Sequence, residues 1–206
     1  LWQHQRQWLC REFGRDAGER LLPVMREFYR LTNIRKPEFM GWTQVELDKK
    51  KYARGWSPVV DTEFSLTAFG GELDRYLNDW RRTTDALQQI EVSLPDRLRD
   101  AFFSHVKYPV LSAAAMSRKM LEAQRARAIA KTHADNDEAQ PDTALLTACA
   151  KSQDAYQEIL RLTDDYNNRL AGGKWKHLIT SHPRDLSVFV APNLPDTLTD
   201  AEVSTY

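Results

Sequence analysis

The chain has 206 residues, of which 42% are hydrophobic, and its 29 Lys and Arg balance 29 Asp and Glu. This length suits one sizeable domain or two small ones with an apolar core. The formal net charge of +0 excludes the basic excess typical of nucleic-acid and acidic-membrane surfaces. No apolar run approaches the roughly 18–20 residues of a membrane span. We therefore expect no nucleic-acid or membrane partner.

The first third of the chain predicts two helices followed by loops. The first helix should close at Gly14. Asp16 with Glu19 three residues on resembles a capping box for the second helix. Pro23 should kink that helix or shift its start. Residues 35–66 show no sustained period, and we expect aromatic-rich turns there.

Three later segments carry the alternating three-and-four spacing of a helix with one apolar face. Pro109 lies inside the second of them and cannot donate a hydrogen bond to the carbonyl of His105, so we expect a kink. Asp142 or Thr143 is the expected N-cap of the third. The three stripes are Leu73, Tyr76, Leu77, Trp80, Thr84 and Leu87; Leu98, Phe102, Val106, Val110, Ala113, Met116 and Met120; and Leu145, Cys149, Ser152, Tyr156, Ile159, Thr163, Tyr166 and Leu170.

The third helix should end at Gly172 and Gly173, either of which can supply a positive φ. From Leu186, β-branched residues bounded by prolines favour an extended tail. The sequence therefore predicts an all-α fold, an antiparallel bundle of about four to five helices with a kinked long helix and an extended C-terminal tail. The predicted units are a helical domain (1–185) and a linker (186–206); the domain comprises N-terminal helices and loops (1–65), three long helices (66–170) and an exit segment (171–185).

Most catalytic signatures are absent from the sequence, including the Gly-rich phosphate loops, GxSxG and HExxH. His177 and His182 have the wrong spacing for two metal ligands on one helical face. Cys10 and Cys149 show no CxxC spacing, and whether they pair is left open. We predict no catalytic residue, no cofactor and no metal site in this chain.

One stretch, YNNRLAGGKWKHL, differs from the rest of the chain. Asn167 and Asn168 precede the glycines by one turn, and Lys174, Trp175 and His177 place an aromatic ring beside hydrogen-bond donors. Such a ring suits the C–H face of a sugar or a protein groove, so these five residues are candidates for a substrate-contacting rim. The alternative is a Trp that closes the end of the bundle, with cations near the helix C-terminus.

Several phrases together resemble the helical region of glycoside hydrolase family 115, the xylan α-1,2-glucuronidases. The more specific blocks are Phe102–Val110 and Tyr166–His177. Lys176 departs from the Asn that the family usually has, and LITSHPRDLSVFV replaces a polar-aromatic stretch. The matching phrases are WLCREFG, RKPEFM, FSLTAFGGELDRYLNDW, DAFFSHVKYPVLSAAAMSRKM and YNNRLAGGKWKHL, in that order.

The resemblance implies a fragment of an enzyme that removes glucuronic acid or its 4-O-methyl form from xylan side chains. It implies a preceding catalytic barrel, which holds the two carboxylates, and a following β-sandwich, to which the linker would lead. It further implies a homodimer and a secreted or periplasmic location. The helical region would be inactive alone and would contact glucuronoxylan only within the full enzyme.

Two other classes of function stay open. One is a free-standing helical adaptor that binds a protein partner through an amphipathic groove. The other is a small complete hydrolase or lyase, which needs a pocket with convergent titratable groups. The module interpretation is distinguished by an exposed aromatic patch where the barrel would sit, involving Trp2, Trp8, Trp42 or Trp56.

Overall fold

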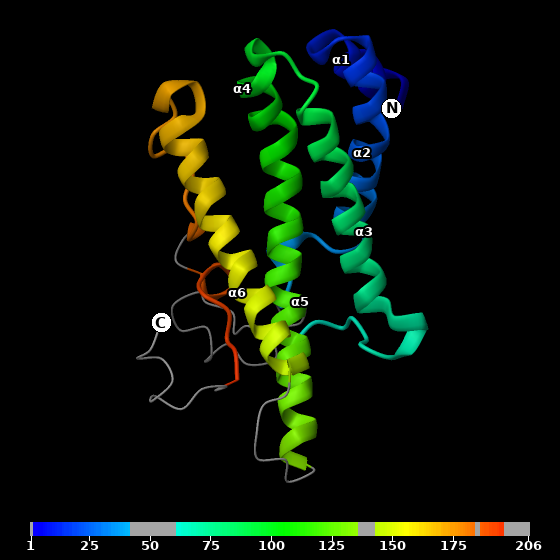
Figure 1. The fold of residues 1–206 in the computed structure, drawn as a ribbon, viewed down its shortest axis with the longest axis vertical. Helices are drawn as coiled ribbons and strands as arrows, with labels where there is room; N and C mark the ends of the chain where they lie inside the picture. Colours follow the sequence, from blue (N-terminus) through cyan, green and yellow to red (C-terminus); the bar gives the residue numbers. More distant parts are fainter. Residues whose placement is uncertain (1, 42–60, 136–142, 184–185, 196–206) are drawn as a thin grey trace, which may run out of the picture.

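The apolar stripes fold into long helices in the computed structural model, which describes residues 2–41, 61–135, 143–183 and 186–195. Within these ranges every regular element is helical and no strand occurs, so the all-α prediction is confirmed. Asp142, Trp42 and Trp56 lie outside the described residues. The long helices are α1 (Trp2–Phe13), α2 (Arg15–Ile34), α3 (Ala68–Glu91), α5 (Tyr108–Asp135) and α6 (Thr143–Asp164) (Figure 1).

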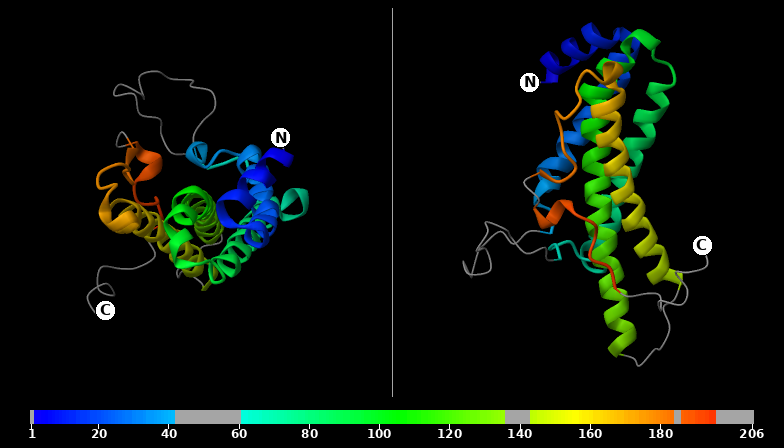
Figure 2. Two further views of the ribbon diagram at one scale, coloured as in Figure 1. Left: turned by 90° about the horizontal axis from the view of Figure 1, so that it is seen from above. Right: turned by 90° about the vertical axis from the view of Figure 1, so that its left-hand side faces the viewer.

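The central element of the bundle is α5. It is packed by α6 on one side and by α3 on another, while α2 packs on α3 and α1 folds back along α2 (Figures 1 and 2). Trp80, Phe102 and Leu121 are fully buried in the main core. The apolar faces of neighbouring helices therefore share one interior, as the stripes predict.

Some positions of the stripes differ from the prediction. In α3 the buried threonine is Thr83, whereas Thr84 is only half-buried. In the third stripe, Tyr156 of α6 and Tyr166 of the following turn are only half-buried. The helical period correctly predicts which face of each helix is apolar. How deeply each residue on that face is buried depends on the elements that cover it.

The chain bends just before α5, and the bend has a local cause. Pro109 has no backbone N–H and cannot bond the carbonyl of His105. The preceding residues form a π-helical turn, η4 (Phe103–Lys107), after the short elements η3 (Asp96–Leu98) and α4 (Arg99–Phe102). At the end of this turn the Tyr108 N–H donates to the Phe103 carbonyl oxygen. The wider turn accommodates the proline, and the predicted kink is confirmed.

The first helix ends at Phe13, directly before Gly14, as predicted, but the start of α2 differs from the prediction. No side chain caps α2. The Glu19 carboxylate instead accepts hydrogen bonds from the Arg6 guanidinium of α1, with a distance of 2.8 Å between Arg6 Nε and Glu19 Oε1. The capping box at Asp16 is therefore wrong, because its glutamate binds across the α1–α2 interface.

The sequence predicts that Pro23 either kinks the second helix or shifts its start, and the structure excludes the shift. It lies well inside α2, which begins at Arg15 and continues to Ile34. The proline therefore does not set the start of the helix.

The segment after α6 returns to the bundle. It passes through η5 (Asp165–Arg169), η6 (Leu170–Gly173) and η8 (Ser187–Phe189). Val188 is 0% exposed and joins the main core. The sequence predicts an extended linker from residue 186. The described part, 186–195, instead packs on α5, because burial of its apolar side chains lowers the free energy relative to their exposure to water.

The close approach of α1 and α2 depends on Gly18. A Cβ atom placed on this residue would lie 2.5 Å from both the Cα and the N of Cys10. These are backbone atoms, which can give way only if the whole of α1 moves. Gly18 therefore sets the spacing of α1 and α2, and with it the shape of the surface between them.

We predict that Gly18→Ala destabilises the protein. Helix propensity alone would favour alanine by about 1 kcal/mol, but overpacking against backbone costs about 1–3 kcal/mol. Chemical denaturation should therefore show a net loss of stability, whereas Asn78→Ala on the exposed face of α3 should change little. A Gly18→Ala protein that is more stable than the wild type would show that α1 adjusts freely.

Candidate functional site

The two asparagines of the predicted rim hold the turn after α6 in place. Asn167 Nδ2 donates to the Ile179 carbonyl oxygen at 2.8 Å, and Asn167 Oδ1 accepts from the Ile179 N–H at 3.2 Å. Asn168 Nδ2 donates to Asp164 Oδ1 at 2.7 Å. Both side chains therefore form hydrogen bonds within the chain. Asn167 links the end of the helix to the segment that returns to the bundle.

The other three rim candidates lie on an exposed turn. Gly172 and Gly173 have φ angles of 66° and 82°, which confirms the predicted positive φ at the helix end. Trp175 is 40% exposed, and the Lys174 ammonium lies 4.9 Å from the centre of its ring. His177 is also exposed. Trp175 is thus not a buried core residue, and its ring remains available at the surface.

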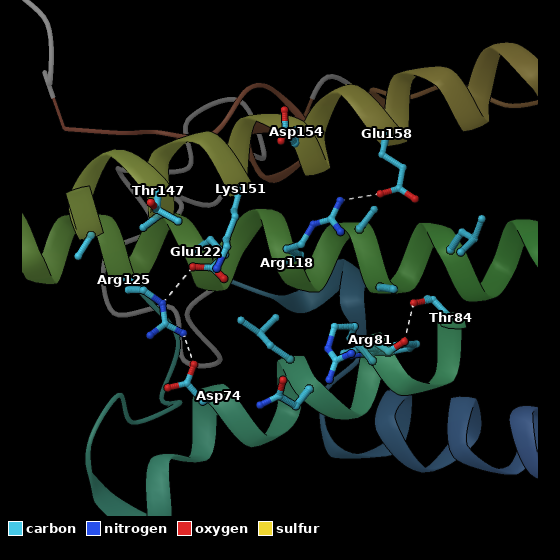
Figure 3. Close-up of a pocket in the computed structure, with 18 of the residues that line it drawn as sticks. Asp74, Arg81, Thr84, Arg118, Glu122, Arg125, Thr147, Lys151, Asp154 and Glu158 are labelled. Atoms are coloured by element: carbon cyan, nitrogen blue, oxygen red, sulfur yellow. Dashed lines mark hydrogen bonds and ion pairs between the residues drawn. The ribbon is translucent and has the colours of Figure 1, made fainter. Parts of the chain in front are cut away.

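A groove of about 820 Å³ runs along α5 between α3 and α6 (Figure 3). We call it the α5 groove. Alanines and leucines such as Leu111 and Ala114 form part of its lining. The charged residues that line it are Asp74, Arg81, Arg118, Glu122, Arg125, Lys151, Asp154 and Glu158.

Much of the charge in the α5 groove is paired between helices. Arg118 of α5 binds Glu158 of α6 at 2.6 Å. Arg125 binds Glu122 at 3.0 Å and also binds Asp74 of α3 (Figure 3). Because these carboxylates already bind guanidinium groups of neighbouring residues, they are not free to contact a substrate. The α5 groove is better suited to contact with another chain than to catalysis.

A larger hollow of about 1140 Å³ lies between α1, α2 and the following η1 (Pro37–Phe39). We call it the α1–α2 hollow. Trp2 and Tyr29 are 45% and 50% exposed, and Trp8 is half-buried. The residues that line the α1–α2 hollow are Trp2, His4, Gln5, Trp8, Arg26, Tyr29, Arg30, Thr32, Asn33, Lys36 and Glu38.

The aromatic walls of the α1–α2 hollow are held by neighbouring side chains. The His105 ring stacks on Trp8 with ring centres 6.1 Å apart. The Arg26 guanidinium lies 5.0 Å from the centre of the Trp2 ring. At the edge of the hollow the Lys36 ammonium lies 6.0 Å from the centre of the ring of Phe39, which is not itself a lining residue. The hollow therefore combines fixed aromatic rings with cations at its edge.

The sequence indicates Trp2 and Trp8 but misses the α2 side of this hollow. Arg26, Tyr29 and Asn33 recur at three- and four-residue spacing, so they share one face of α2, which borders its buried apolar stripe at Leu22. That spacing is a usable signal. It is easily read as an ordinary solvated face, because only the fold shows that α1 runs beside it.

Lys119 is an unusual buried cation. It is 1% exposed, and Lys119 Nζ donates to the Val188 and Val190 carbonyl oxygens at 2.7 and 2.8 Å. The Tyr156 ring centre lies 5.6 Å away, and the Tyr156 hydroxyl is hydrogen-bonded to His182. In the described part of the chain no carboxylate pairs with it. Burial therefore lowers the pKa of Lys119 to about 8.

The described residues offer no group of three or more His, Cys, Asp or Glu placed to hold a metal ion. Cys10 and Cys149 are both free thiols, and burial raises the pKa of Cys149. None of the described helices has the length and apolarity needed to cross a membrane. The chain matches no protein-family model and no curated protein.

We predict that Trp175→Ala lowers the free energy of unfolding by only about 1 kcal/mol or less, since the ring is substantially exposed. Trp80→Ala is the matched control, because removing a buried Trp should cost about 3–5 kcal/mol. Urea denaturation of both variants makes the comparison. Equal losses would mean that Trp175 is part of the core.

We predict that Lys119 makes stability rise with pH. The pKa of Lys119 is about 8 in the folded protein against an ordinary value of 10.5, so the unfolded chain binds the proton more tightly. Its contribution is complete above pH 10.5 and is lost as the pH falls through 8. Relative to Lys119→Met, the unfolding free energy of the wild type should rise across this window by up to about 3 kcal/mol. Denaturation curves with no pH-dependent difference between the two proteins would contradict the burial of a charged amine.

Proposed function

We propose that this chain is a non-catalytic helical module of a larger protein and that it docks on a neighbouring domain through the α1–α2 hollow. The observation that carries the proposal is the exposure of Trp2 and Tyr29 on one hollowed surface. Large aromatic side chains that remain open in this way usually mark a surface that something else covers. The module interpretation requires such a patch around Trp2 and Trp8.

The larger protein that we propose is a multidomain α-glucuronidase that hydrolyses (4-O-methyl)glucuronic acid from xylan side chains. Two features support it: the all-helical fold, and the contact between the two sequence blocks that carry the resemblance. Phe103 and Tyr108 of the first block lie 6.2 and 4.8 Å, centre to centre, from the Tyr166 ring of the second. Blocks far apart in the chain thus form one aromatic cluster.

In this proposal the chemistry belongs to a barrel domain, where two carboxylates cleave the glycosidic bond. The helical module supports the barrel and contributes to a homodimer, and a β-sandwich follows. The enzyme is secreted or periplasmic. Trp175 and Lys174, which lie on an exposed turn, are available to touch the xylan chain.

The α5 groove favours a second candidate function, a free-standing adaptor. Its lining combines alanine and leucine side chains with charges from three helices, which suits an amphipathic helix of a partner. This candidate places the partner on α5 rather than on α1 and α2. The two functions therefore predict different interaction surfaces.

The full-length protein tests the proposed function. We expect it to release uronic acid from glucuronoxylan, with a barrel pattern of alternating strands and helices encoded upstream of Leu1, while the helical chain alone releases none. Trp2→Ala should lower the activity or the melting temperature of the full-length protein. Leu146→Ala, which removes an exposed apolar residue of α6, should change neither.

Two results would overturn this assignment. One is release of uronic acid by these 206 residues alone. The other is a full-length protein that has no barrel, in which case the adaptor becomes the better account.

A further inference from the structure

Two cations of the α1–α2 hollow have aromatic partners but no anionic ones. Arg26 lies over Trp2, and Lys36 lies over Phe39. Neither takes part in an ion pair with any residue that the structure describes. Glu38 is the one carboxylate among the lining residues, and it makes no ion pair within the described ranges either.

Several other arginines of α1 and α2 are paired, although Arg15 is not paired with any described residue. Arg6 binds Glu19 at 2.5 Å, and Arg30 binds both Glu27 and Asp79. The hydrogen bonds that the Arg30 guanidinium donates to the Glu27 carboxylate are the main reason that the pKa of Arg30 is held above its ordinary value. Arg30, which also lines the hollow, thus has carboxylate partners, whereas Arg26 and Lys36 have none among the residues that the structure describes.

A third polar group of the hollow also lacks a partner. Gln5 Oε1 is buried and accepts no hydrogen bond from any described residue. A buried acceptor without a donor is costly, and natural proteins leave few of them. Gln5 belongs to α1, whereas Arg26 belongs to α2. Each wall of the hollow therefore holds a polar group without a polar partner among the described residues.

We propose that the surface which covers the α1–α2 hollow is an acidic segment of a protein, with a carboxylate placed against Arg26 and Lys36. This inference rests on the proposed docking function and specifies the chemistry of the docked partner.

Desolvation of the two cations decides which partner the hollow can accept. A purely apolar partner that covered the hollow would remove water from two cations without replacing it, and an uncompensated buried charge is strongly destabilising. A carboxylate removes this penalty and gains charge-assisted hydrogen bonds from the guanidinium. The ring of Trp2 already holds the Arg26 side chain, so less conformational entropy is lost on pairing.

The composition of the hollow fits a protein partner. Trp, Tyr and Arg are the residue types that most often dominate the energy of protein interfaces, and Trp2, Tyr29 and Arg26 lie together here. A carboxylate on a protein segment, flanked by an apolar or aromatic side chain, would use both the cations and the rings.

The test is a selection of random peptides displayed on phage against the purified chain, followed by binding measurements with synthetic copies of the selected peptides. We expect the selected peptides to carry Asp or Glu next to an aromatic or apolar residue. Their affinity should fall by about tenfold or more in the double variant Arg26→Gln, Lys36→Gln, and should weaken with added salt.

The matched control is Lys174→Gln with Lys176→Gln. It removes the same charge from an exposed turn where Lys174 also lies over an aromatic ring, that of Trp175. Binding of the selected peptides should be unchanged in this control. Circular dichroism of each variant shows that the helices are intact.

Several outcomes would overturn the inference: no enrichment of acidic peptides, equal binding to the Arg26→Gln, Lys36→Gln variant, or a homodimer that Trp2→Ala dissociates. Loss of binding in Trp2→Ala without loss in the charge variants rejects the acidic partner but keeps the docking surface. Peptides that bind only outside the hollow reject the acidic partner and also remove the support for the proposed docking function.

Discussion

The arrangement of this protein depends on buried polar side chains of α5 that satisfy the backbone of irregular segments. Lys119 bonds the carbonyls of the returning tail. Further along α5, Gln124 donates to the carbonyls of Thr62 and Phe64 and accepts from the Thr62 N–H. Unpaired backbone groups could not be buried here without large cost. The same helix therefore anchors the chain before α3 and the chain after α6, and both segments can lie against the core.

The sequence predicts the long helices well because helical spacing is a local property. Leu73 and Trp80 repeat at that spacing, and both are buried. It predicts the ends less well. Asp16 and Glu19 have the spacing of a capping box, but the Glu19 carboxylate accepts hydrogen bonds from Arg6 of another helix. Such competition between a local and a tertiary partner is invisible until the two helices are placed side by side.

The candidate site was predictable only in part, for a similar reason. Trp2 and Trp8 are conspicuous as large aromatics on an otherwise polar segment. In the sequence Arg26 looks like an ordinary surface residue, and Tyr29 looks like one of the apolar residues of its helix. Both line the hollow only because α1 lies beside them. The predicted rim after α6 shows the opposite case. Asn167 is an obvious candidate in the sequence, yet its side chain forms hydrogen bonds with the backbone of Ile179 and so stabilises the fold.

The tail held by Lys119 also defines where this folding unit can end. A polypeptide terminated at residue 185 would lack Val188 and both carbonyl acceptors of the ammonium. An empty apolar slot and a cation without ligands would then remain beside Tyr156. The folded unit therefore extends at least to Val190, beyond the last long helix, and any dissection of the chain into separately produced pieces should respect that limit.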